Sequence, residues 1–93
     1  MIRLTILLTN MEPKKPIHMK EGLQLLDIAR ESRQRVWIKA WDLHGNIIEY
    51  KGWLVSSSNW RGGWHKIINP VNNEIRTVPD IFMFNINGHP IYL

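Results

Sequence analysis

The sequence predicts an α+β fold: a mostly antiparallel, strongly twisted sheet or partly open small β-barrel of five to seven short strands, with one packed helix. Three observations support this prediction. Residues 35–55 form two strand patterns joined by a tight turn, residues 19–33 carry a helical pattern, and residues 81–93 contain a second hairpin signal. At a length of 93 residues, we expect one domain that spans residues 1–93.

The N-terminal residues 2–8 alternate in the manner of a strand with one apolar face. The apolar positions of this face are Ile2, Leu4, Ile6 and Leu8. Residues 9–16 contain two prolines and a pair of lysines, which predict a surface connection because proline disfavours both helix and central strand. We expect these lysines to be solvated charges.

Residues 19–33 are the one helix candidate. Leu25, Leu26, Ile28 and Ala29 are assigned to one broad side, with Leu23 at its border, which predicts an amphipathic helix covering one face of the sheet. Gly22 weakens the pattern, and no clear N-cap residue precedes it.

The hairpin of residues 35–55 is the centre of the prediction. Asp42 opens its turn and Gly45 closes it, a spacing typical of a type I turn followed by a left-handed glycine. If Asp42 lies opposite Asn46, then Lys39 faces Glu49 and Trp37 faces Lys51, which gives an ion pair and a cation–π pair. The predicted core face carries Val36, Ile38, Ala40, Ile48, Tyr50 and Leu54. The predicted solvent face carries Trp37, Lys39, Trp41, Ile47, Glu49, Lys51 and Trp53.

The remaining residues predict further short strands. Serines and paired glycines indicate a mobile loop over residues 56–64, followed by a strand at 65–68, a turn at 69–73 and an outgoing strand at 74–78. A strand over 81–86 ends at Asn87-Gly88, the best two-residue hairpin turn in the chain. Pro90 marks the last strand as an edge strand.

Composition narrows the function classes. The chain has no cysteine and a net charge of +4, which excludes thiolate metal sites and permits an anionic partner such as nucleic acid. The N-terminus lacks the features of a signal peptide, and no apolar run reaches the length of a membrane span, so we expect a cytoplasmic protein without membrane contact. The four histidines are dispersed, and no catalytic or phosphate-binding motif is present. We therefore expect no enzymatic activity, no metal and no cofactor.

The tryptophans are the anomaly, since five occur in 93 residues. Three explanations remain open: a second packing surface covered by the loop or by another copy of the chain, a stacking platform for bases, or a protein–protein patch. The candidate residues for binding nucleic acid or a partner are Trp37, Lys39, Trp41, Lys51, Trp53, Trp60, Arg61 and Trp64.

The C-terminal third carries residues 73–78, the pair Ile81-Phe82 and the run Ile86-Asn87-Gly88-His89-Pro90-Ile91-Tyr92. In these residues the chain resembles small proteins of phages and mobile elements of Bacteroidetes. The resemblance implies a mobile-element context and a small β-rich fold, and it implies no known activity and no functional residue.

Together these patterns lead to two hypotheses. The first is a non-enzymatic accessory protein that binds single-stranded nucleic acid through the face of Trp37, Lys39, Trp41, Lys51 and Trp53. The second is a homo-oligomeric or partner-binding module that buries the same face in protein.

Overall fold

The computed structural model describes residues 14–93, which form one seven-stranded sheet and one α-helix. The elements in chain order are β1 (Ile17–His18), α2 (Met19–Ser32), β2 (Arg35–Trp41), β3 (Ile47–Asn59), β4 (Trp64–Ile68), β5 (Ile75–Pro79), the 3₁₀ turn η1 (Asp80–Phe82), β6 (Met83–Ile86) and β7 (His89–Tyr92). Every strand pair is antiparallel except β1 with β7. The predicted α+β class, with a mostly antiparallel sheet and one helix, is therefore confirmed.

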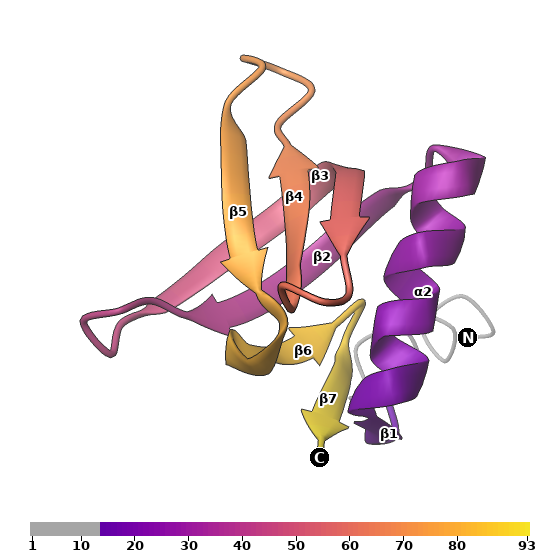
Figure 1. Ribbon diagram of the computed structural model, residues 1–93, viewed down its shortest axis with the longest axis vertical. Coiled ribbons are helices and arrows are strands. Elements are labelled where there is room, and N and C mark those ends of the chain that lie inside the picture. Colours follow the sequence, from indigo (N-terminus) through magenta and orange to yellow (C-terminus); the bar gives the residue numbers. More distant parts are fainter. Residues whose placement is uncertain (1–13) are drawn as a thin grey trace, which may run out of the picture.

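The strand order is β1-β7-β6-β2-β3-β4-β5, so the described part of the sheet is open and has β1 and β5 at its edges. Strands β2 to β5 follow one another as a meander, and η1 then returns the chain so that β6 lies beside β2. Figure 1 shows α2 standing beside the sheet, while the end of the β2–β3 hairpin projects away from the helix. We call this projecting part, residues 40–48, the arm. The predicted strand at residues 2–8 lies outside the described residues.

The hairpin has the predicted register, from Trp41 opposite Ile47 to Trp37 opposite Lys51. The N–H of Asp42 donates to the carbonyl of Asn46 at 2.9 Å, as the turn prediction requires. One carboxylate oxygen of Asp42 also accepts the N–H groups of His44 and Asn46, each at 2.8 Å. The aspartate therefore caps its own turn, and the carboxylate fixes the register of the hairpin.

The register changes at Gly52, and this change corrects two predictions. Val36 pairs with Trp53 while Trp37 pairs with Lys51, so Gly52 is the extra residue of a β-bulge and has a φ of 79°. The extra residue reverses the facing of the residues that follow it. Trp53 therefore points into the core and is 9% exposed, whereas Leu54, predicted in the core, is only half-buried and lies outside the core cluster.

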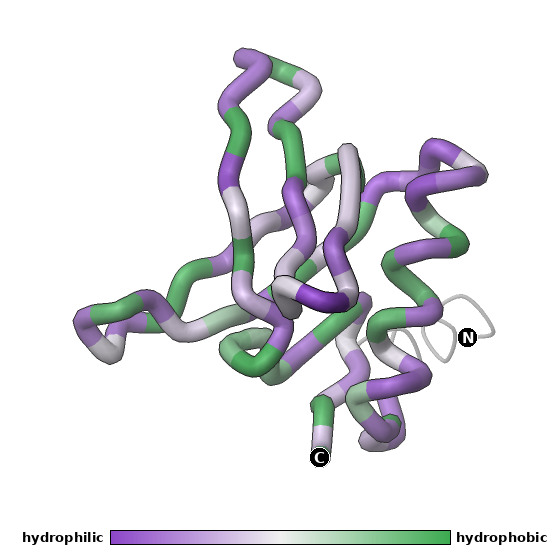
Figure 2. The backbone as a smooth tube through the Cα atoms, viewed as in Figure 1, coloured by the Kyte–Doolittle hydropathy of each residue, from purple (hydrophilic) through white to green (hydrophobic). Residues whose placement is uncertain are grey.

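Buried apolar side chains of five strands and the helix form one core, into which Trp53 packs edge-on against Tyr50 with ring centroids 5.1 Å apart. Along the strands, hydrophobic and hydrophilic residues alternate, as Figure 2 shows. The cluster consists of Leu26, Ala29, Val36, Ile38, Ala40, Tyr50, Trp53, Val55, Ile67, Val78, Met83 and Ile86. Its centre is the inner face of β2, as the hairpin analysis predicts.

Helix α2 runs one residue short of its predicted end, and its caps come from residues that the sequence did not reveal as caps. The Nδ1 atom of His18 accepts the N–H of Lys20 at 3.0 Å, and Arg33 ends the helix in the left-handed conformation. Leu26 and Ala29 are buried, but Ile28, predicted on the same side, is 61% exposed. Two positions along an α-helix correspond to a rotation of about 200°, which turns Ile28 away from the face of Leu26. No helix within residues 14–93 is both long and apolar enough to cross a membrane.

The loop predicted at 56–64 is largely strand. β3 continues to Asn59 and pairs with β4, so only the residues between Asn59 and Trp64 turn. Cross-strand hydrogen bonding to β4 offsets the weak strand preference of the serines, which propensity alone did not predict.

The C-terminal part differs from the prediction in two ways. The first residues of the predicted strand 81–86 belong to η1, and only Met83–Ile86 is strand. The Asn87-Gly88 turn is confirmed, with φ values of 53° and 89°. Pro90, predicted on an edge strand, lies in β7, which has β6 on one side and β1 on the other. β1 pairs only with Ile91 and Tyr92, so the missing N–H of Pro90 costs no hydrogen bond to β1.

Candidate binding surface

Trp37 lies on the outer face of β2, with a lysine on each of two neighbouring positions. Lys39 follows it on the same face, and Lys51 lies opposite it on β3. The ammonium nitrogens of both lysines lie 5.2 Å from the centre of the Trp37 ring. The indole N–H donates to Glu49 at 3.0 Å, which fixes the ring plane. We call Trp37, Lys39, Glu49 and Lys51 the Trp37 surface.

The backbone beneath Trp37 is held by the β6–β7 turn. The N–H of Trp37 donates to the side-chain oxygen of Asn87 at 3.0 Å, and the N–H of Asn87 donates to the carbonyl of Trp37 at 2.7 Å. A hollow of about 350 Å³ adjoins the ring, and the exposed cations Lys14 and Arg35 line it. The surface and its hollow thus carry four cations and the single carboxylate Glu49, a positive field around one aromatic ring.

Trp41 lies on the same face as Trp37 but belongs to another patch. It sits four residues further along β2, about 13 Å away by the rise of a strand. Its ring is 45% exposed and contacts Phe84 of β6, with centroids 5.3 Å apart. Ile47, its cross-strand partner, is 58% exposed. This end of the hairpin is therefore apolar and aromatic rather than basic.

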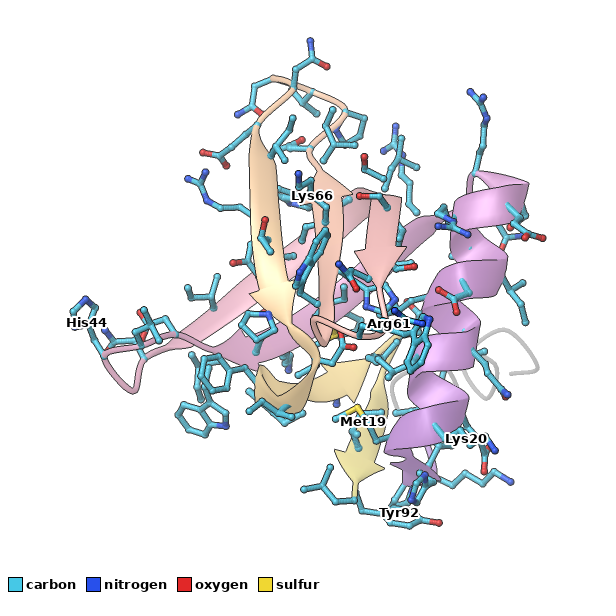
Figure 3. The ribbon with its side chains drawn as sticks, in the orientation of Figure 1. Met19, Lys20, His44, Arg61, Lys66 and Tyr92 are labelled. Atoms are coloured by element: carbon cyan, nitrogen blue, oxygen red, sulfur yellow. The ribbon has the colours of Figure 1, made fainter. Side chains whose placement is uncertain are left out.

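Trp60 and Arg61 lie in the β3–β4 turn and Trp64 begins β4, so all three are remote from the Trp37 surface. The guanidinium of Arg61 lies 5.3 Å from the Trp60 ring, and the ammonium of Lys66 lies 5.6 Å from the Trp64 ring. Trp64 pairs with Asn59, eight residues beyond Lys51 on β3, which corresponds to about 26 Å of strand. In Figure 3, Arg61 lies at the β3–β4 turn and Lys66 lies on β4, both away from His44 at the tip of the arm.

The predicted site residues therefore divide into four groups. Trp37, Lys39 and Lys51 come together as predicted. Trp41 forms an apolar patch with Phe84, and Trp60, Arg61 and Trp64 form a separate aromatic–cationic turn. The prediction that Trp53 lies on the surface is wrong, because the Gly52 bulge turns its side chain into the core.

One polar cluster escaped the sequence analysis. His65 is 4% exposed, its Nδ1 lies 2.7 Å from a carboxylate oxygen of Asp80, and its Nε2 lies 3.3 Å from one of Asp27. The three residues come from β4, η1 and α2, so no spacing in the sequence could have indicated their convergence. Each ring nitrogen already has a carboxylate partner, and the cluster ties the helix to the sheet. Within residues 14–93, no group of three or more such side chains is arranged to hold a metal ion.

Comparison of the chain with protein-family models, with curated proteins and with solved structures finds no match. The interpretation of the surfaces therefore rests on their own chemistry.

Proposed function

We propose that this protein is a non-enzymatic binding protein for single-stranded nucleic acid and that the Trp37 surface makes the contact. The observation that carries the proposal is a half-buried indole with two lysine ammonium groups, each 5.2 Å from the ring centre. Proteins that bind single strands combine an aromatic stacking platform with cations that follow the phosphates, and each stacked base contributes about 1–3 kcal/mol.

The surface suits such a ligand because its cations are flexible and its ring is fixed. A lysine is a mobile point charge on a four-carbon stem, so Lys39 and Lys51 can move from the ring to phosphates when a base stacks. The indole is held by Glu49 and by the backbone bonds to Asn87, so little rotational freedom is lost on binding. Lys14 and Arg35 beside the hollow extend the positive track beyond one nucleotide.

A non-enzymatic role is part of the proposal because the buried histidine of the described residues has no free ring nitrogen. Both nitrogens of His65 lie within hydrogen-bond distance of carboxylates. His65 therefore presents no free ring nitrogen that could take a substrate proton as a general base.

The test is a fluorescence titration with oligothymidylate and oligoadenylate at several salt concentrations. We expect tryptophan quenching at low salt. The double variant Lys39→Gln with Lys51→Gln should make the slope of log K against log salt shallower by about 1.4, since each phosphate contact on a single strand contributes about 0.7. The matched control, Lys20→Gln with Arg33→Gln, removes the same charge from α2 and should keep the slope.

Two results would contradict the proposal. One is the absence of quenching by any oligonucleotide at low salt. The other is an equal loss of slope in the surface variant and in the helix control, which would indicate attraction by net charge alone.

A second candidate function is self-association or binding of a protein partner through the same face of the hairpin. The exposed pair Trp41 and Ile47, with Phe84 beside Trp41, favours it because aromatic side chains are typical of interface centres. Sedimentation equilibrium of the wild type and of Trp41→Lys tests self-association. A monomer at all concentrations in the wild type would eliminate the homo-oligomer.

A further inference from the structure

The second surface of interest lies on the other side of the arm, where β5 ends the sheet. A groove of about 340 Å³ separates the two, with Ala40, Trp41 and Tyr50 of the hairpin on one side and Thr77, Pro79 and Phe82 on the other. Most of these side chains are apolar or aromatic, as in ligand grooves of this size. Of the candidate binding residues predicted from the sequence, the groove contains only Trp41, and it shares no residue with the Trp37 surface.

The floor of the groove adjoins the core, and its end is acidic. Tyr50 is 9% exposed, and burial raises the pKa of its hydroxyl, so the phenol stays neutral. Asp42 also lines the groove. The N–H of Asn46 lowers the pKa of the Asp42 carboxyl, which favours the ionised form. Among the described residues, no lysine or arginine forms a salt bridge with Asp42.

Within residues 14–93, the rim of the groove is the free edge of β5, whose open backbone groups can be located. At one end of β5, the N–H of Asn69 donates to the carbonyl of Glu74 at 2.8 Å. At the other end, the N–H of Asp80 donates to the carbonyl of Gly63, also at 2.8 Å. Along an antiparallel ladder, hydrogen-bonded pairs alternate with pairs that form no hydrogen bond to each other. Between the two ends of β5, the residues of the second kind are Ile75, Thr77 and Pro79, and their backbone groups point away from β4.

Thr77 is the centre of this free edge. Pro79 has no N–H, and the carbonyl of Ile75 already accepts a bond from the side chain of Arg76 at 3.1 Å. Thr77 therefore offers both an outward N–H and an outward carbonyl, directly beside the groove that this residue lines. One position with both groups open, between two positions that each lack one open group, admits a short segment and limits uncontrolled edge-to-edge pairing.

We propose that this groove binds an extended peptide segment of a partner protein, which carries a lysine or arginine. The peptide backbone pairs with Thr77 as an additional strand beside β5, and its apolar side chains contact Trp41, Tyr50 and Phe82. Its basic side chain pairs with Asp42. Main-chain bonds to a sheet edge supply affinity in this binding mode, and pockets for alternate side chains supply specificity. The proposal concerns a different site from the Trp37 surface.

The test uses a display library of randomised heptapeptides selected against the full-length protein and counter-selected against the variant Thr77→Pro. Proline removes only the outward N–H of Thr77 and leaves the bonds to β4 in place, so the variant should fold. We expect enrichment of alternating apolar peptides with a basic residue that bind the wild type and lose binding to Thr77→Pro. Thr77→Val, which keeps the backbone groups, should bind as the wild type does.

The charge is tested separately with Asp42→Asn. The amide oxygen of asparagine can still accept the N–H groups of His44 and Asn46, so the turn is preserved while the charge is lost. We expect binding of an enriched basic peptide to weaken about two- to five-fold, the range of a solvent-exposed ion pair. The control is Glu31→Gln, which removes an exposed negative charge from α2 and should leave peptide binding unchanged.

Several results would overturn the proposal. Enriched peptides that bind Thr77→Pro as well as the wild type would exclude edge pairing. Failure of the library to yield any basic peptide would exclude the site. In an NMR titration with an enriched peptide, chemical-shift changes that fall outside the groove would also exclude it. Concentration-dependent shifts at Thr77 without peptide would assign the groove to a second copy of the chain. The variant with Lys39→Gln and Lys51→Gln should keep peptide binding, so failure of this proposal is distinguishable from failure of nucleic-acid binding.

Discussion

The Gly52 bulge decides which tryptophans reach the surface, and a substitution at Gly52 tests it directly. A Cβ at this position would meet no atom within 4 Å, so the cost of Gly52→Ala comes only from its φ of 79°. A left-handed conformation costs an L-residue about 1–2 kcal/mol. For a domain of this size, that loss lowers the melting temperature by about 4–16 °C.

The assay combines thermal unfolding with a readout of Trp53. Gly45→Ala is the matched control, because Gly45 has a φ of 80° and equally open surroundings but lies in the turn of the arm. Both variants should lose stability. A variant in which Gly52 is deleted should keep Trp53 in the core, because Trp53 then directly follows Lys51 and still lies opposite Val36 in regular alternation.

The spectroscopic signature reports the position of Trp53. The near-ultraviolet circular dichroism of the edge-on pair Tyr50–Trp53 should persist in Gly45→Ala and also when Gly52 is deleted. A wild type without this signal and a Gly52 deletion variant that gains it would refute the reasoning. Trp53 would then lie on the solvent face, and the simple alternation of the sequence would hold through the whole of β3.

Three further predictions concern other parts of the fold. His65→Ala should lower the unfolding free energy in urea by about 1–3 kcal/mol, because it leaves the buried Asp80 carboxylate without its partner; equal stability would exclude a role for the cluster in holding α2. Asp42 has a lowered pKa in the folded state, so its contribution is present above the unfolded value near 3.9 and is lost as pH falls through the folded value. The difference in melting temperature between wild type and Asp42→Ala should therefore shrink between pH 5 and pH 2, and a constant difference would contradict this. Gly22→Ala should destabilise by about 1–3 kcal/mol despite the better helix propensity of alanine, since its Cβ would lie 2.8 Å from Ile91; a gain in melting temperature would show that Ile91 yields freely.

Alternation and turn chemistry predicted the hairpin well as far as Lys51. Cross-strand pairing depends on nearby residues only, so Asp42 and Gly45 sufficed to fix the register. Beyond Lys51 the alternation fails, although one signal was available, since a single glycine inside a strand pattern is typical of a bulge. Reading Gly52 in this way would have turned Trp53 inward.

Other features could not be predicted from local patterns. The strand character of residues 56–59 comes from pairing with β4, and the burial of His65 comes from the approach of α2 and η1. Both depend on contacts between residues far apart in the chain. The parallel pair of β1 with β7 likewise joins residue 17 to residue 91, and no turn signal exists for such a pairing.

The bulge also bears on the two proposed binding surfaces, which lie on one hairpin. Trp37 and Lys51 precede the bulge and face outward, whereas Tyr50, opposite Ile38, faces the core and the groove beside β5. Because Trp53 follows the bulge, it supports Tyr50 from within the core instead of widening the Trp37 surface. Trp53→Ala should therefore free Tyr50 and impair peptide binding in the groove, while the pair Trp37–Lys51, whose register is set by Asp42, keeps its contact with nucleic acid. Measuring both ligands on Trp53→Ala separates the two surfaces: parallel loss of both would mean that the hairpin acts as one site.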